Sequence, residues 1–347
     1  MRFEIYLETK IIDYSSGLPN RILVNMSYQR TIIVTGGTVG LGYYTALEIA
    51  KAHPEYLVVV SSRTDREHAA DAINKTLGQR NTVYIPLDLS NLQKVRAYAE
   101  DWAAKSYPPI QALVFNAGLQ FPGGLTKTVD GLESTFAINH VGHALLFHLL
   151  CLYLAPKARV VITSSGTHDP DQISGGMPKP KYISAEVLAH PTAATATDPG
   201  RKRYVESKLA NVLWGYALGR RLQERVPERG ITVTSFDPGL MPGTGLAREA
   251  NAFEKFLWMR VLPKLIPLIR ALIFSNVHRP QESAVALARL VIGADVEGES
   301  GKYFEGMKVI KSSKDSYDVA KQDDLWMWTV GYLAKGDGER ERFEQFK

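Results

Sequence analysis

The sequence predicts a single doubly wound α/β domain, in which a parallel sheet is covered by helices on both faces. Two observations lead to this prediction. Short, uniformly apolar runs alternate with longer helical patterns, and a glycine cluster directly follows the first of these runs. The composition agrees, because 45% of the residues are hydrophobic and 22% are charged, which is enough apolar material for a sizeable core. In such folds ligands bind at the carboxyl ends of the strands.

The expected elements follow one another in strand–helix order. Continuous apolar runs indicate strands that are buried on both faces. These strands are Ile32–Thr35, Leu57–Ser61, Val83–Pro86, Ala112–Phe115, Val160–Thr163 and Ile231–Phe236. Helical patterns fill the intervals at 40–52, 66–78, 91–105, 131–155 and 204–225, and a further helix near 281–293 precedes a short strand near Lys302–Phe304.

The rest of the chain is interpreted around this core. Residues 1–28 are taken as an N-terminal extension without an assigned function, and residues 29–310 as the α/β domain. Residues 311–347 are predicted to form a C-terminal helical tail. Two stretches interrupt the alternation: residues 170–203, rich in Gly, Pro, Thr and Ala, predict a long loop, and the apolar residues 252–274 predict a lid over a substrate pocket.

Charge and cysteine content exclude several classes of protein. The formal net charge is only +5 and no basic run occurs, so a nucleic-acid partner is not expected. The single cysteine, Cys151, cannot form an internal disulfide, and we predict a cytoplasmic protein without a transmembrane helix. His140, His143 and His148 share a predicted helix, but their spacing does not place all three on one ligand face, so no metal site is expected.

The glycine cluster predicts a dinucleotide-binding loop. It follows an apolar strand and opens a helix, so its backbone can approach a pyrophosphate while the free amides and the positive end of the helix dipole face the anion. The spacing is Gly-x-x-x-Gly-x-Gly. The candidate contact residues are Thr35, Gly36, Gly37, Thr38, Gly40, Leu41 and Gly42.

The end of the second strand favours NADP(H) over NAD(H). Enzymes that bind NAD usually place an acidic residue there for the ribose 2′-hydroxyl. This strand instead ends Val60-Ser61-Ser62-Arg63, and an arginine can form a bidentate pair with a 2′-phosphate. Ser62 can add a hydroxyl donor, whereas Asp65 is the one nearby carboxylate that could reach the ribose instead.

A tyrosine and a lysine four residues apart form the candidate catalytic pair. Tyr204 and Lys208 share one face of the predicted helix, and a neighbouring ammonium is expected to lower the pKa of the phenol. Such a phenol can exchange a proton with a carbonyl or alcohol oxygen. Ser164 and Ser165, at the end of the fifth strand, offer a hydroxyl for the same oxygen.

Together these motifs resemble the short-chain dehydrogenase/reductase superfamily, from about residue 29 to residue 310. The resemblance implies a Rossmann-type fold in which Ser165, Tyr204, Lys208 and Asn139 are the catalytic residues. Asn139 would lie at a distorted helix position whose carbonyl holds a proton-relay water, and Lys208 would also bind the nicotinamide ribose. The cofactor-contacting positions that the resemblance adds are Asp88, Leu89, Asn116, Ala117, Gly118, Pro238, Gly239 and Thr244.

Three stretches are similar to particular branches of the superfamily. FAINHVGHALLFHLL and SKLANVLWGYALGRRLQ resemble retinol-dehydrogenase-type members, and DPGLMPGTGL is similar to the protochlorophyllide reductase branch. Two departures are visible: the interval between Ser165 and Tyr204 is longer than in compact members, and Thr244 lies one residue later than in the usual PGxxxT pattern. Asp237, before the proline, has no interpretation from sequence.

The resulting functional prediction is an NADP(H)-dependent oxidoreductase that reduces a carbonyl of an apolar small molecule, or oxidises the matching alcohol. A C=C reductase of the protochlorophyllide type and a non-catalytic NADP-binding regulatory protein are the alternatives. For residues 252–274 the lid is favoured over contact with a membrane surface, because Pro263 and Pro267 are expected to break a long helix. A homodimer through the helices near 131–155 and 204–225 is an open expectation that follows from the resemblance.

Overall fold

A computed structural model describes residues 28–172, 176–245, 251–273 and 275–346, and the predicted N-terminal extension therefore lies almost entirely outside the described part. The eight-stranded sheet has the order β3-β2-β1-β4-β5-β6-β7-β8. All neighbouring strands are parallel except the edge pair β7–β8, which is antiparallel. The strands are β1 Arg30–Thr35, β2 Tyr56–Ser62, β3 Thr82–Pro86, β4 Ile110–Phe115, β5 Leu154–Thr163, β6 Thr232–Asp237, β7 Lys302–Glu305 and β8 Lys308–Ile310.

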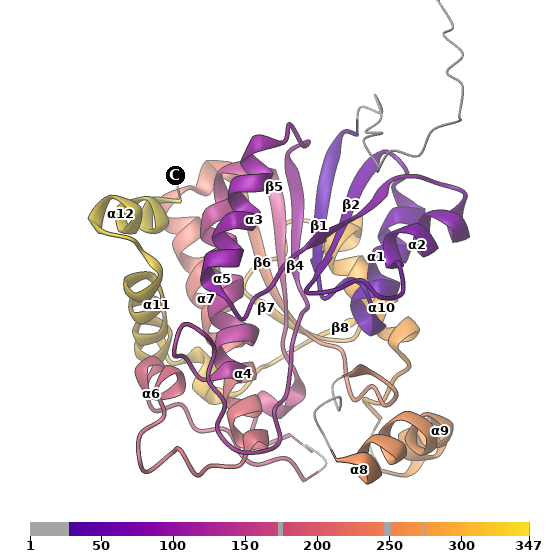
Figure 1. The fold of residues 1–347 in the computed structure, drawn as a ribbon, viewed down its shortest axis with the longest axis vertical. Coiled ribbons are helices and arrows are strands. Elements are labelled where there is room, and N and C mark those ends of the chain that lie inside the picture. The colour runs from indigo at the N-terminus through magenta and orange to yellow at the C-terminus, as the bar shows by residue number, and fades with distance from the viewer. Residues whose placement is uncertain (1–27, 173–175, 246–250, 274, 347) are drawn as a thin grey trace, which may run out of the picture.

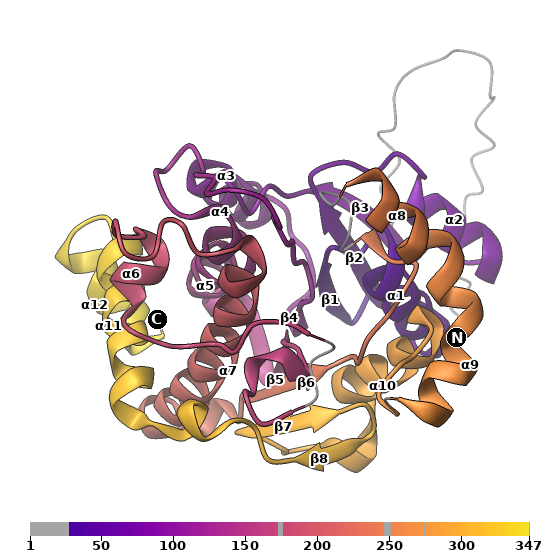
Figure 2. The same ribbon diagram turned by 90° about the horizontal axis from the view of Figure 1, so that it is seen from below.

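The sheet separates two hydrophobic cores, as the apolar strand runs predict. In β1, Ile33 faces one core while Ile32 and Val34 face the other, because successive side chains of a strand point to opposite faces. Helices α1, α2 and α10 cover one face, and α3, α5 and α7 cover the other (Figures 1 and 2). The doubly wound fold is thus confirmed. The helix bounds are α1 Gly40–Ala52, α2 Ala69–Leu77, α3 Leu92–Ala104, α5 Gly142–Leu150, α7 Gly200–Arg225 and α10 Pro280–Ile292.

Among the described helices, the segment that contains α5 is the one long and apolar enough to span a membrane, and it runs through the core. It starts with α4 (Ser134–Phe136), continues through a π-helical turn at Ala137–Val141 and ends with α5. By length and composition alone, Ser134–Tyr153 could cross a membrane, but 89% of the apolar window within it is buried inside the protein. Burial between the sheet and the C-terminal tail accounts for its apolar composition.

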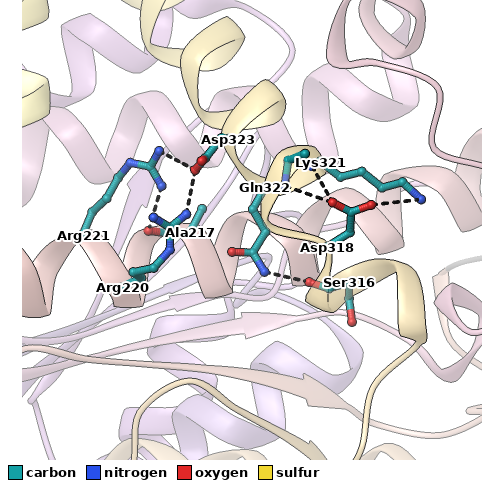
Figure 3. Close-up of polar contacts among 9 residues, drawn as sticks. Ala217, Arg220, Arg221, Ser316, Asp318, Lys321, Gln322 and Asp323 are labelled. Atoms are coloured by element: carbon teal, nitrogen blue, oxygen red, sulfur yellow. Dashed lines mark hydrogen bonds and ion pairs between the residues drawn. The ribbon is translucent and has the colours of Figure 1, made fainter.

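The C-terminal tail packs against the helices of this second face. Its helices are α11 (Val319–Leu333) and α12 (Asp337–Gln345). Asp323 of α11 accepts hydrogen bonds from Arg220 (2.6 Å) and Arg221 (2.8 Å) of α7 (Figure 3). Trp326 lies under the Arg221 guanidinium at 4.6 Å and is itself buried in the core. The tail is therefore part of the domain, and it packs against both α5 and α7, the helices through which a dimer was expected.

Two sequence expectations about irregular regions are wrong. Residues 170–203 are not entirely loop, because α6 (Ala185–Ala189) forms within them and α7 begins at Gly200. In the lid, the prolines do not break the helix: α8 (Ala252–Phe256), a π-helical turn (Leu257–Val261) and α9 (Leu262–Leu272) are continuous. Pro263 lies in the first turn after the π turn, and Pro267 is exposed, so water can satisfy the carbonyl that it frees.

Candidate active site

A cavity of about 740 Å³ lies at the carboxyl edge of the sheet, where the doubly wound fold predicts a site. The ends of β1, β2, β4, β5 and β6 contribute to its walls, and the lid helix forms another side. Most of the predicted residues line this cavity. They are Thr35, Gly36, Thr38, Gly40, Leu41, Ser62, Arg63, Asp88, Leu89, Asn116, Ala117, Gly118, Ser165, Tyr204, Lys208, Pro238, Gly239 and Thr244.

The remaining three predicted residues, Gly37, Gly42 and Asn139, lie behind the cavity wall. A Cβ on Gly42 would meet the Gly36 carbonyl oxygen at 2.3 Å, and a Cβ on Gly37 would meet the Val34 carbonyl oxygen at 2.8 Å. Gly36 and Gly40 have positive φ angles of 64° and 57°. These glycines therefore allow the tight turn, and the first amides of α1 face the cavity without a side-chain cap from Val39.

A buried histidine ties the glycine loop to the asparagine segment. The neutral ring of His143 shares hydrogen bonds with the Asn139 carbonyl (Nδ1, 3.1 Å) and with Thr35 Oγ1 (Nε2, 2.9 Å). Burial lowers the pKa of His143 to about 4, so Nδ1 donates to the carbonyl and Nε2 accepts the threonine proton. Thr35 Oγ1 also accepts the amides of Asn116 and Ala117. Sequence analysis assigned no such role to His143.

The end of β2 presents a basic residue rather than an acidic one. Arg63 is exposed at the cavity wall and makes no ion pair with any described residue. Thr38 Oγ1 donates to Ser62 Oγ at 2.9 Å, which joins this strand end to the glycine loop. Asp65 is engaged elsewhere, because both of its carboxylate oxygens accept the Ala69 amide at the start of α2. Arg63 thus remains available to an anion at this end of the cavity, as does the exposed Arg66, which also lines it.

The Ser165, Tyr204 and Lys208 side chains meet in the centre of the cavity wall. The Ser165 hydroxyl lies close enough to Tyr204 to act on the pKa of the phenol, and Lys208 Nζ lies 5.7 Å from the centroid of the Tyr204 ring. Lys208 Nζ donates to the Thr163 carbonyl at 3.0 Å. Ser164 is used structurally, because its hydroxyl donates to the Lys208 carbonyl at 2.8 Å. The geometry therefore favours Ser165 as the hydroxyl that faces a ligand.

Burial controls the protonation of this group. It raises the pKa of Tyr204 far above its usual value, Asp237 raises it further, and the nearby Ser165 hydroxyl acts in the opposite direction. Burial lowers the pKa of Lys208 to about 8, and Asp237 counteracts this. The expected lowering of the phenol pKa by Lys208 is thus not found in the protein alone, because desolvation of both side chains is the larger effect.

Asp237, which the sequence left without an interpretation, is buried beside the catalytic candidates. It accepts hydrogen bonds from the Gly239 amide (2.9 Å) and the Asn276 side chain (2.9 Å), and Gly166 lies close against its carboxylate. Burial raises its pKa to about 6. Because Asp237 acts on the pKa values of both Tyr204 and Lys208, it belongs to the electrostatics of the site. Only its position after a buried strand, before Pro238, could have indicated this from sequence.

The helix that carries Asn139 is distorted, as the resemblance implies. Asn139 lies in the π-helical turn Ala137–Val141, and its side chain bonds both backbone groups of Leu119 (2.8 and 3.0 Å) and Ser207 Oγ (3.0 Å). Through Ser207 it is fixed to the same helix as Tyr204 and Lys208. Asn139 therefore positions α7 rather than touching the cavity directly.

The lid closes the cavity with a largely apolar wall. Trp258, Leu262, Ile269 and Ile273 line it, and Trp258 Nε1 donates to the Thr244 carbonyl at 3.0 Å. Glu254 of α8 pairs with Arg201 of α7 at 3.0 Å. The lid helix is thus attached on both sides of the cavity, to the segment after β6 and to the start of α7.

Comparison with known proteins agrees with this geometry. Residues 30–175 match the family model described as short chain dehydrogenase. The chain is 31% identical over 323 residues to short-chain dehydrogenase TIC 32 A, chloroplastic, of Brassica napus, covering 86% of this chain and 87% of the relative. It is 29% identical over 314 residues to retinol dehydrogenase 14 of Mus musculus, covering 87% and 85%.

Solved structures show the same fold. The angucycline C-6 ketoreductase LanV with bound NADP has a TM-score of 0.57 at 21% identity, covering 81% of this chain and 96% of that chain. A short-chain type dehydrogenase/reductase from Mycobacterium marinum has a TM-score of 0.56 at 19% identity, covering 80% and 94%. The fold and site define a Rossmann-type oxidoreductase. The chain belongs to the short-chain dehydrogenase/reductase family, in its retinol-dehydrogenase-like branch.

Proposed function

We propose that the protein reduces a carbonyl group of an apolar small molecule with NADPH. The observation that carries this proposal is the convergence of Ser165, Tyr204 and Lys208 on one wall of a cavity whose opposite wall is the apolar lid. An apolar wall favours a substrate with little polar surface beyond the reacting group.

The residues at the carboxyl edge fit an NADP cofactor. The close approach of Gly42 to the Gly36 carbonyl leaves no room for a side chain, and the uncapped start of α1 offers amides for a pyrophosphate. Arg63 and Ser62 would hold a 2′-phosphate, and Lys208 and Thr244 would hold the nicotinamide end. When bound, the cofactor supplies the hydride.

The protein's own contribution is to hold the substrate oxygen and to move a proton. Ser165 and Tyr204 would both hydrogen-bond that oxygen, and Tyr204 would donate its proton to it as charge develops there. At pH values below about 8, Lys208 carries a positive charge next to the phenol. This charge would stabilise the phenolate that Tyr204 becomes after it has donated its proton. Asn139, fixed to Ser207, keeps α7 in register.

The first prediction tests Tyr204. In Tyr204→Phe we expect kcat for NADPH-dependent reduction of apolar aldehydes and ketones to fall at least about a hundredfold, because the proton donor is lost. Turnover is followed by NADPH absorbance over a substrate panel. Tyr216→Phe, on the same helix with its hydroxyl on Ser312, is the matched control and should keep its activity. If Tyr204→Phe turned over as fast as the wild type, Tyr204 would not be the proton donor. If the wild type bound NADPH but consumed it with no substrate of the panel, a regulatory role would be favoured instead.

A further inference from the structure

The lid helix Ala252–Leu272 is apolar on two sides, although only one of them serves the cavity. Trp258, Leu262 and Ile269 line the cavity. On the outside, Phe253 (70% exposed), Phe256 (57%), Leu268 (54%) and Leu272 (74%) face solvent. Figures 1 and 2 place α8 and α9 at the periphery of the molecule, apart from the helices that cover the sheet. Nothing in the described part of the fold covers this outer side.

The π-helical turn Leu257–Val261 explains how both apolar sides persist along the helix. Such a turn accommodates one residue more than an α-helical turn, so residues after it are rotated back by about 100°. With this rotation Leu265, Leu268 and Leu272 come to the same side as Phe253 and Phe256. The turn therefore aligns an outer stripe, which we define as Phe253, Phe256, Leu265, Leu268 and Leu272.

Positive charge surrounds the outer stripe. Lys255, Arg260 and Lys264 are exposed, and none of them makes an ion pair with another described residue. The other charged residues of the helix are engaged: Glu254 pairs with Arg201, and Arg270 pairs with Glu282 at 2.6 Å. The charged side chains of the lid helix that have no ion-pair partner among the described residues are therefore all positive.

We propose that the outer stripe docks on a membrane surface that carries anionic lipids. An amphipathic helix with Phe and Leu on one side and Lys and Arg beside them is the kind that lies in the plane of such an interface. A second copy of the chain fits the stripe less well, because a two-fold contact would place each cluster of cations against its own image. Free lipid headgroups alone would leave the apolar stripe uncovered.

The location of the cavity gives this docking a consequence for substrate access. Ile273 lines the cavity and is 70% exposed, so the cavity reaches the surface at the end of the outer stripe. A docked lid would bring the opening against the lipid phase, from which an apolar substrate could enter. This consequence rests on the proposed function, whereas membrane binding itself does not, so the two can fail separately.

Sedimentation with lipid vesicles tests the proposal on the full-length chain. We expect binding to phosphatidylcholine vesicles containing phosphatidylserine and weaker binding to phosphatidylcholine alone. Binding should also weaken when the salt concentration is raised well above about 0.1 M.

In the triple variant Phe253→Ser, Leu268→Ser, Leu272→Ser, the affinity for these vesicles should fall by about a hundredfold or more. The matched control, Val129→Ser, Val285→Ser, Met327→Ser, alters exposed apolar residues elsewhere and should bind like the wild type. None of the six residues lines the cavity, so NADPH affinity should stay unchanged in both variants.

A site-specific label identifies the contacting face. The only cysteine, Cys151, is buried, so Leu268→Cys can be labelled with an environment-sensitive dye, with Met327→Cys on α11 as control. Vesicles should shift the emission to the blue only at position 268. Binding that is equal on neutral vesicles, or is unchanged in the triple variant, would overturn the proposal. So would a concentration-dependent dimer in ultracentrifugation that the triple variant abolishes, because a second copy would then occupy the stripe.

Discussion

The carboxylate of Asp237 lies where the turn after β5 and the turn after β6 meet. One of its oxygens accepts the backbone amide of Gly239, the other accepts from Asn276 in the chain beyond the lid, and Gly166 lies close against the carboxylate. The same charge acts on Tyr204 and Lys208. A single buried residue therefore fixes backbone geometry and sets the electrostatics of the proton donor.

For Asp237→Asn we expect the alkaline limb of the kcat/KM profile to move to lower pH, on the order of one unit. The negative charge raises the pKa of Lys208, so without it the ammonium loses its proton at lower pH than about 8. The measurement is the pH dependence of NADPH-dependent reduction. Asp295→Asn, an exposed residue paired with Arg289, is the control and should leave the profile in place. An unmoved limb in Asp237→Asn would contradict the assignment.

Arg63 gives the prediction for cofactor choice. In Arg63→Ala the affinity for NADPH should fall by about tenfold or more, because one charge-assisted pair with the 2′-phosphate is lost, while the affinity for NADH should hardly change. Titration of each cofactor against intrinsic fluorescence measures both constants. Arg80→Ala, exposed and outside the cavity, is the control. A parallel loss for both cofactors would show that Arg63 does not read the 2′-phosphate.

At the scale of elements, the contact between α5 and the tail carries a buried histidine without a polar partner. His148 stacks on Phe343 with ring centroids 4.6 Å apart and also contacts Trp326. Neither of its ring nitrogens has a hydrogen-bond partner among the residues that the structure describes. Burial lowers the pKa of His148 to about 3, so the ring is neutral in the fold. The unfolded chain, with a pKa near 6.5, takes up a proton at higher pH than the fold does.

His148→Phe should therefore stabilise the protein, and more so in acid. At pH 7.5 we expect a gain of about 1 kcal/mol, because two unsatisfied nitrogens are removed. Below pH 6.5 the wild type loses stability as pH falls, since its folded pKa lies below its unfolded pKa, and by pH 5 the extra difference is on the order of 2 kcal/mol. Urea unfolding at both pH values measures this.

The control for this prediction is His190, which lies half-buried beside Glu186. His190→Phe removes no buried unsatisfied nitrogen and should not raise the free energy of unfolding. If His148→Phe and the wild type lose stability in parallel between pH 7.5 and pH 5, the protonation argument is wrong.

At the scale of the whole molecule, the C-terminal tail completes the second face of the sheet. Leu325, Trp326 and Val330 belong to the same core as α5 and α7. Asp323 fixes this docking by accepting from Arg220 and Arg221 (Figure 3). The tail therefore packs against α7, the helix that carries Tyr204 and Lys208.

Asp323→Asn should lower the free energy of unfolding by about 1 kcal/mol. The loss is this small because the ion pairs of Asp323 with Arg220 and Arg221 are partly exposed, and water screens them. The substitution leaves the less exposed Arg221 without its charged partner. Asp101→Asn, an exposed residue on α3, is the control and should unfold like the wild type. A variant as stable as the control would show that apolar packing alone holds the tail.

The doubly wound sheet and most of the residues expected at the site, which line the cavity, could be predicted from the sequence. The sheet, the glycine loop and the Tyr204–Lys208 pair follow from local patterns: apolar runs buried on two faces, glycines that a tight turn requires, and a tyrosine and a lysine on one helix face. Most of the other cofactor positions followed from the family resemblance. The start of β5 at Leu154, the edge strand β8, the helix within residues 170–203 and the unbroken lid helix did not follow from local pattern, because tertiary contacts and solvent exposure outweigh propensity there.

Only the tertiary structure decided the environment of each group. Desolvation raises the pKa of Tyr204 and lowers that of Lys208, and Asp237, His143 and the tail reach the site through contacts between residues far apart in the chain. Burial and long-range proximity are properties of the packed molecule, since they depend on which distant segments exclude water from a side chain. A linear pattern specifies which groups are present, and packing specifies their charge, their partners and the surface that the lid leaves exposed.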